Sequence, residues 1–175
     1  MTVTWKSFLL RPRPSRRTRD EFVAYTQSWE RPGSMEPQLG FRPWSSTDDP
    51  PSHSLPALAA ARVVAGFGDD AISRAFRWGL FRAYFVDHRT ISRPEVQADV
   101  ADAAGLDRGA FLDRLGAERE DAVEQVIAEH DEANEQGITA VPTVVIGDAI
   151  AVPGVQEVET YLRLIDRVAE LRAAS

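Results

Sequence analysis

Alternation of apolar and polar positions marks one segment near the N-terminus. Within Val3–Leu10, β-branched and aromatic side chains recur at alternate positions, so that Val3 and Trp5 fall on one side and Lys6 on the other. A period of two is typical of a β-strand, and we expect a strand over these residues. Pro12 follows and breaks the pattern.

A helical period dominates the middle of the chain. Apolar side chains recur three or four positions apart, and glycines at positions 66, 105 and 137 follow the runs. Ser92 and Glu95 have the spacing of a capping box. We therefore expect helices over residues 18–30, 55–64, 69–85, 92–105, a short one begun by Asp107, and 118–136. Residues 31–54 are rich in Pro, Gly and Ser, and long loops of this kind often lie over a functional site.

Short apolar runs return near the C-terminus. Residues 143–146 (TVVI) and 149–152 (AIAV) are separated by Gly147-Asp148, which has the composition of a two-residue hairpin turn that starts with glycine. Pro153-Gly154 ends the second run, and apolar positions spaced as on one helix face continue from Val158 to Ala169. The predicted order is strand, several helices, hairpin and a final helix.

The net negative charge of the chain bears on which kinds of partner it can bind. The 175 residues carry a formal net charge of −7 with a pI of about 5.0, which argues against a nucleic-acid-binding protein. Arginines at positions 11, 13, 16, 17 and 19 form a basic cluster, which reads as a solvated linker in preference to a phosphate site. No segment reaches the roughly 18 apolar residues of a membrane span, and residues 1–10 lack the pattern of a secretory signal. We expect a cytoplasmic protein that binds neither nucleic acid nor membrane.

The chain has no cysteine, which excludes a disulfide, a thiolate metal site and a cysteine nucleophile within these residues. The three histidines, His53, His88 and His130, are far apart and share no helical spacing. Because a metal site needs three or four converging donors, we expect no metal.

Residues 137–147 (GITAVPTVVIG) resemble the loop and terminal hairpin of the DsbA family of thioredoxin-fold proteins, in which a cis-proline precedes a strand. That family includes glutathione-dependent 2-hydroxychromene-2-carboxylate isomerases and kappa-type glutathione transferases. Weaker similarities occur elsewhere, in the same order along the chain as in the family. Residues 5–10 resemble the second strand of the fold, and further similarities lie at residues 80–85, 91–92 and 152–156. The resemblance implies an α/β, thioredoxin-like fold with an all-helical insertion. Residues 1–50 and 137–175 would form the partial thioredoxin-like domain, and residues 51–136 the inserted helical domain.

The resemblance also implies a binding edge. A cis bond between Val141 and Pro142 would leave the backbone N–H and C=O of Val141 open to an extended thiol-containing peptide or to glutathione. The alternative from composition alone is that Pro142 merely begins a strand. We take Val141, Pro142 and Thr143 as candidate substrate-binding residues and expect no catalytic residue. His53 and Trp44, in or beside the long loop, are added as candidate substrate contacts, and glutathione is the small molecule that would fit.

In the DsbA family a first strand and a helix that carries C-x-x-C, or a serine in the glutathione-dependent branch, precede the segment that Val3–Leu10 resembles. The resemblance therefore implies that these residues include neither the first strand nor the active-site helix. Three outcomes follow: Val3–Leu10 pairs directly with residues 143–146, a second chain donates a strand in a homo-oligomer, or the functional protein starts further upstream. The implied function is that of a DsbA-like protein of the thiol–disulfide oxidoreductase family, redox-incompetent as this chain. The alternatives are a fragment of a glutathione-dependent isomerase or transferase, and a non-catalytic binding subunit.

Overall fold

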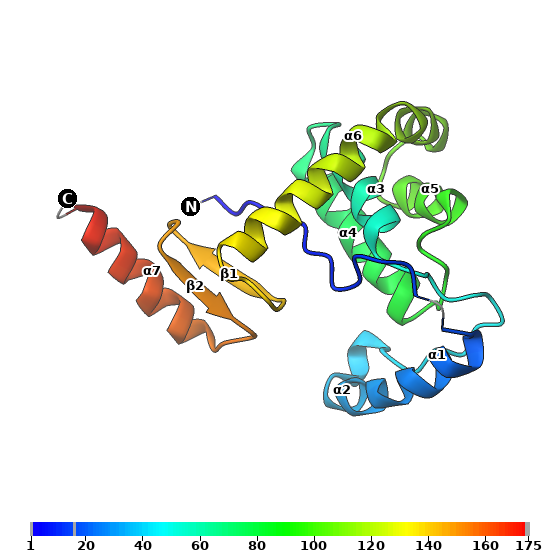
Figure 1. Ribbon diagram of the computed structural model, residues 1–175, viewed down its shortest axis with the longest axis horizontal. Helices are drawn as coiled ribbons and strands as arrows, with labels where there is room; N and C mark the ends of the chain where they lie inside the picture. Colours follow the sequence, from blue (N-terminus) through cyan, green and yellow to red (C-terminus); the bar gives the residue numbers. More distant parts are fainter. Residues whose placement is uncertain (1, 16, 174–175) are drawn as a thin grey trace. The chain divides into compact units, whose positions relative to one another are not determined.

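The computed structural model describes residues 2–15 and 17–173, so Arg16 of the basic cluster lies outside the described residues. The chain divides into two compact units. One contains the N-terminal residues up to Phe8 together with everything from Glu129 onward, and the other contains Leu9–Ala128. Figure 1 labels the helices and strands.

The larger unit is helical. Its elements are α1 (Arg19–Thr26), the 3₁₀ turn Gln27–Trp29, α2 (Glu30–Met35), a second 3₁₀ turn (Pro37–Leu39), α3 (Leu55–Ala65), α4 (Asp70–Phe85), α5 (Pro94–Ala103) and most of α6 (Arg108–Glu135). The alanine-rich face of α3 lies against α4 and α5, and Phe76 and Phe111 fill the centre with no exposed surface. Gly79 permits close packing of α4 on α5, because a Cβ there would lie 2.6 Å from Val100 Cγ1.

The loop that precedes α3 is held by an aromatic cluster. Trp44 is 1% exposed and lies edge-on to Phe22, with ring centroids 5.5 Å apart. The Trp44 ring also contacts Tyr84 of α4, with centroids 5.8 Å apart, and it stacks on His88, with centroids 5.4 Å apart. Because these residues bury large apolar surfaces, the Pro-rich segment is anchored to the helices at Trp44.

The smaller unit contains a hairpin and a helix. Strands β1 (Thr143–Ile146) and β2 (Ile150–Pro153) pair antiparallel, with Thr143 opposite Pro153 and Ile146 opposite Ile150. Helix α7 (Val158–Ala173) contacts β1, and Val168 is its buried residue (Figure 1). The predicted hairpin and final helix are confirmed. The turn differs in detail, since three residues separate Ile146 from Ile150 and both Gly147 and Asp148 have positive φ.

The strand expected over Val3–Leu10 is wrong. No strand is assigned there, and β1 pairs with β2 alone within the described residues, so the direct pairing with residues 143–146 does not occur. The segment instead follows the end of α6: the Ser7 N–H donates to Glu129 Oε2 at 2.8 Å, and Phe8 lies edge-on to His130. Alternation favours a strand only where a neighbouring strand offers backbone partners.

Three helix predictions also need correction. The helix expected over residues 18–30 is divided by the 3₁₀ turn at Gln27–Trp29. Asp107 caps its helix as expected, accepting from the Ala110 N–H at 2.8 Å, but that helix continues as the single 28-residue α6. The Ser92 capping box is absent, because α5 begins at Pro94 and its N-cap residue, Arg93, forms no side-chain cap. Proline at the first helical position needs no donor there, so the helix starts without the box.

The compact units do not follow the expected domain boundaries, since residues 9–50 group with the helices. Those boundaries remain a prediction. None of the helices in the described part of the chain combines the length and apolarity needed to cross a bilayer.

Candidate functional site

The candidate loop begins where α6 ends. Gly137 has φ of +77°, and its N–H donates to the Asn134 carbonyl while the Ile138 N–H donates to the Ala133 carbonyl, both at 2.9 Å. These two bonds form a Schellman motif, which satisfies the last carbonyls of the helix and turns the chain. Gly137 therefore fixes the point at which the loop leaves α6.

The loop is tied at both sides of Pro142. The Val141–Pro142 peptide bond is cis. Thr143 Oγ1 donates to the Ala140 carbonyl at 2.7 Å, and the Gly154 N–H donates to the Pro142 carbonyl at 2.8 Å. The side-chain bond closes the loop, and the backbone bond is the first hydrogen bond of the β1–β2 ladder.

One backbone position between these ties is open. Within the described residues, neither the N–H nor the C=O of Val141 forms a hydrogen bond. Val141 is also 43% exposed. Polar backbone groups that the fold leaves unpaired must bond to water or to a ligand, so Val141 offers one donor and one acceptor to an approaching molecule.

The open position continues along the outer edge of β1. Because the Gly154 N–H bonds to the Pro142 carbonyl, Val144 and Ile146 form the hydrogen-bonded pairs with β2. The backbone groups of Thr143 and Val145 then point away from β2. Val141, Thr143 and Val145 thus present a row of backbone donors and acceptors at an open strand edge.

The far end of the hairpin is held by α7. Arg172 donates to the Gly147 carbonyl at 3.0 Å and lies 3.8 Å from the Asp148 carboxylate. A Cβ at Gly147 would come within 2.5 Å of Val168 Cγ1, and its φ is +61°, so the turn requires glycine. At the other end, Tyr161 donates its hydroxyl to the Gly154 carbonyl at 3.2 Å.

This edge offers backbone hydrogen-bonding groups flanked by apolar side chains. Val141, Val144 and Val145 are each about two-fifths exposed, and they surround the backbone row with apolar side chains. No thiol is present anywhere in the sequence. Across residues 2–15 and 17–173, no three potential His, Asp or Glu ligands lie together as a metal would require. The arrangement can bind an extended backbone that carries small or apolar side chains.

The profile of the DSBA-like thioredoxin domain matches residues 47–166. The match contains the loop, both strands and most of α7, together with α3 to α6. The chain belongs to this family. A search of curated proteins finds no match. Membership relates the chain to thiol–disulfide oxidoreductases, and the absence of cysteine means that these residues contain no C-x-x-C.

His53 and Trp44 lie in the helical unit, whereas Val141–Thr143 lies in the other unit. His53 is half-buried, with Nδ1 2.8 Å from Ser52 Oγ. Trp44 is packed inside the aromatic cluster, with 1% of its surface exposed. The role of either residue as a substrate contact remains a prediction, and the packing of Trp44 is that of a core residue.

His88 is a buried polar residue that the sequence did not single out. It is 3% exposed, its Nδ1 accepts from the Ser45 N–H at 3.0 Å, and its Nε2 lies 3.2 Å from the Arg42 carbonyl. This arrangement suits the neutral ring with its proton on Nε2. Burial lowers the pKa of His88, and the hydrogen bond to the Arg42 carbonyl opposes this shift. The Arg42 charge lowers the pKa further, and the Asp87 charge raises it. Its φ of +52° places it in the left-handed region, where Asn is among the best-tolerated residues other than glycine.

We expect the free energy of unfolding to decrease as the pH falls below about 6.5 because of His88. The unfolded state binds the proton more tightly than the folded state. The contribution of His88 to stability is therefore complete above its ordinary pKa, and it is lost as the pH falls towards the lowered pKa of the folded state. Urea unfolding between pH 7.5 and 5.5 measures this slope. His88→Asn should flatten the profile, and an unchanged slope in that variant would contradict the assignment.

Proposed function

We propose that this chain is a DsbA-like domain that binds extended thiol-containing peptides at the Val141–Thr143 edge without exchanging disulfides itself. The observation that carries the proposal is the open backbone of Val141, in a chain of this family that has no cysteine. A peptide would add to β1 as a further strand, with backbone bonds supplying affinity and alternate side chains supplying selectivity.

Geometry supports a peptide better than glutathione alone. The row formed by Val141, Thr143 and Val145 is longer than the single position that a small thiol needs. Its apolar surroundings suit side chains of an extended peptide, which alternate in direction. Glutathione is the competing ligand, and its binding would favour the glutathione-dependent branch of the family.

The catalytic half of the proposal is tested by thiol–disulfide exchange. The chain should leave the rate of dithiol oxidation by oxidised glutathione at the uncatalysed value, because a thiolate is the attacking group in such exchange and the chain supplies none. Turnover that scales with the concentration of pure protein would refute it.

The binding half is tested with a cysteine-containing hexapeptide and a matched pair of proline variants. Val145→Pro removes an N–H that points away from β2 and should weaken peptide binding by about tenfold or more, while the hairpin is retained. Val144→Pro removes a ladder bond to β2 and should destabilise the hairpin. Calorimetric titration measures the affinity, and chemical-shift changes at β2 report the fold.

A second probe separates backbone pairing from general adhesion. The same hexapeptide methylated at a central backbone nitrogen keeps its side chains but loses a donor, so it should bind more weakly than the parent. Equal binding of the two peptides, or full affinity in the Val145→Pro variant, would contradict strand addition at this edge. Heat from glutathione but not from the peptide would transfer the assignment to the isomerase or transferase branch.

A further inference from the structure

Three arginines of the basic cluster near the N-terminus line a pocket of the helical unit. The pocket has a volume of about 240 Å³, and Arg11, Arg17 and Arg19 line one part of it. Asp49 and Ser52, which come from the segment before α3, line another part. These three arginines, which the sequence suggested to be part of a solvated linker, therefore lie at a concavity.

Two of these arginines form cation–π contacts with aromatic rings. The guanidinium carbon of Arg17 lies 4.3 Å from the centroid of the Tyr25 ring, and that of Arg11 lies 5.6 Å from the same centroid. Arg11 also lies 5.6 Å from the centroid of Phe22. A guanidinium group that lies over a ring retains N–H donors at its edge, and Arg11 uses part of that edge in a hydrogen bond to Tyr84.

Nearby acids offset part of this positive charge: hydrogen bonds from Thr18 lower the pKa of Glu21, and the charge of Arg17 lowers it further. Within the described residues, neither Arg11 nor Arg17 forms an ion pair with a carboxylate. Glu21 accepts from the Thr18 N–H and hydroxyl at 2.7 and 3.0 Å, which engages it in the cap of α1. Arg19 lies 3.6 Å from Asp20, so its charge is partly offset. The pocket keeps an excess of positive charge in a protein whose formal net charge is −7.

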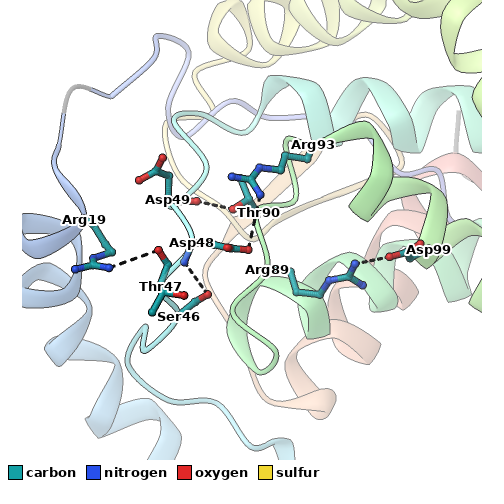
Figure 2. Close-up of polar contacts among 9 residues, drawn as sticks. All are labelled: Arg19, Ser46, Thr47, Asp48, Asp49, Arg89, Thr90, Arg93 and Asp99. Carbon is teal, nitrogen blue, oxygen red and sulfur yellow. Dashed lines mark hydrogen bonds and ion pairs between the residues drawn. The ribbon is translucent and has the colours of Figure 1, made fainter.

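The segment before α3, which lines the pocket with Asp49 and Ser52, is hydrogen-bonded to other parts of the helical unit. Figure 2 shows Arg19 reaching the Thr47 carbonyl, at 3.5 Å, from α1. In the same view the Thr90 hydroxyl donates to the Asp49 carbonyl, and Arg93 lies 3.9 Å from the Asp48 carboxylate. The Ser15 N–H donates to the Ser52 carbonyl at 2.7 Å and joins the two walls. Asp49 is the acidic residue among those that line the pocket. Its single negative charge is smaller than the combined positive charge of Arg11 and Arg17.

We propose that this pocket binds a phosphate group, either as inorganic phosphate or as the phosphate of a small ester. Two guanidinium forks on separate residues can each bond to a pair of oxygens, which a tetrahedral phosphate supplies and a single carboxylate does not. The pocket is smaller than the roughly 300–1,000 Å³ typical of sites for larger organic ligands. All three lining arginines precede the residues that match the family profile. The pocket residues belong to the helical unit, whereas the Val141–Thr143 edge belongs to the other unit.

Calorimetric titration of the full chain with inorganic phosphate, phenyl phosphate and acetate at constant ionic strength tests the proposal. Phosphate should bind saturably and acetate at least about tenfold more weakly. Arg17→Gln should weaken phosphate binding by about tenfold or more, because it removes a fork. Arg13→Gln is the matched control: it removes the same charge from the same segment, but Arg13 does not line the pocket, and binding should change less than about twofold.

Arg17→Lys separates the fork from the charge and should retain only part of the affinity. Thermal unfolding of each variant confirms that the fold is retained. Tighter binding of phenyl phosphate than of inorganic phosphate identifies an ester as the ligand, and the reverse order identifies the free anion. Equal losses in the Arg13 and Arg17 variants, or no saturable binding of either phosphate up to roughly 20 mM, would overturn the site.

Discussion

Replacing Trp44 by alanine is expected to lower the free energy of unfolding by about 3–5 kcal/mol. Trp44 is almost fully buried, and its removal leaves a cavity between Phe22, Tyr84 and His88. The loss includes edge-on and stacked ring contacts in addition to the buried area. Urea unfolding followed by circular dichroism measures the change.

Trp78→Ala is the matched control for Trp44→Ala. Trp78 lies on α4 with 65% of its surface exposed, so the same substitution there should change the free energy of unfolding by less than about 1 kcal/mol. The comparison also tests the substrate-contact prediction for Trp44. A Trp44→Ala variant of unchanged stability but weakened peptide binding would show that Trp44 is a ligand contact and not a core residue.

Phe111→Ala is expected to destabilise the helical unit by a similar amount, about 3–5 kcal/mol. Phe111 has no exposed surface and packs against Phe76, with ring centroids 5.9 Å apart. It brings the start of α6 into the core that α3, α4 and α5 share. The midpoint of thermal unfolding and the urea-derived free energy both report the loss.

The neighbouring residue supplies the control for Phe111→Ala. Leu112 follows on the same helix but is 36% exposed, so Leu112→Ala keeps the helical propensity and loses much less buried surface. The smaller loss should come from Leu112. Equal destabilisation by the two substitutions would mean that Phe111 is not a centre of the core.

The hairpin, the final helix and the candidate loop could be predicted because their signals are local. Residues 143–146 are β-branched and apolar, glycine stands at the turn, and Pro142 precedes the strand. Family membership, first indicated by residues 137–147, is shown by the profile match. Open backbone groups at Val141 followed from the same motif, and the structure places no hydrogen bond on them within its described residues.

Other features depend on partners that the sequence does not specify. Val3–Leu10 has the alternation of a strand, yet the Ser7 N–H bonds to Glu129, a side chain more than a hundred residues away. Tertiary contacts of this kind override local propensity. The arginine pocket was equally hidden, because its second wall at Asp49 and Ser52 meets the arginines only through folding. The burial of Trp44 was hidden for the same reason, because a loop position does not reveal how the side chain packs.

The row of unpaired groups on β1 also limits how this protein behaves at high concentration. An open strand edge that contains the partly exposed Val144 and Val145 is a template for pairing with an extended segment of another chain, including a misfolded one. Mutual repulsion between acidic molecules slows such encounters at low salt. Screening by added salt weakens that protection, so solubility is expected to decline as ionic strength rises.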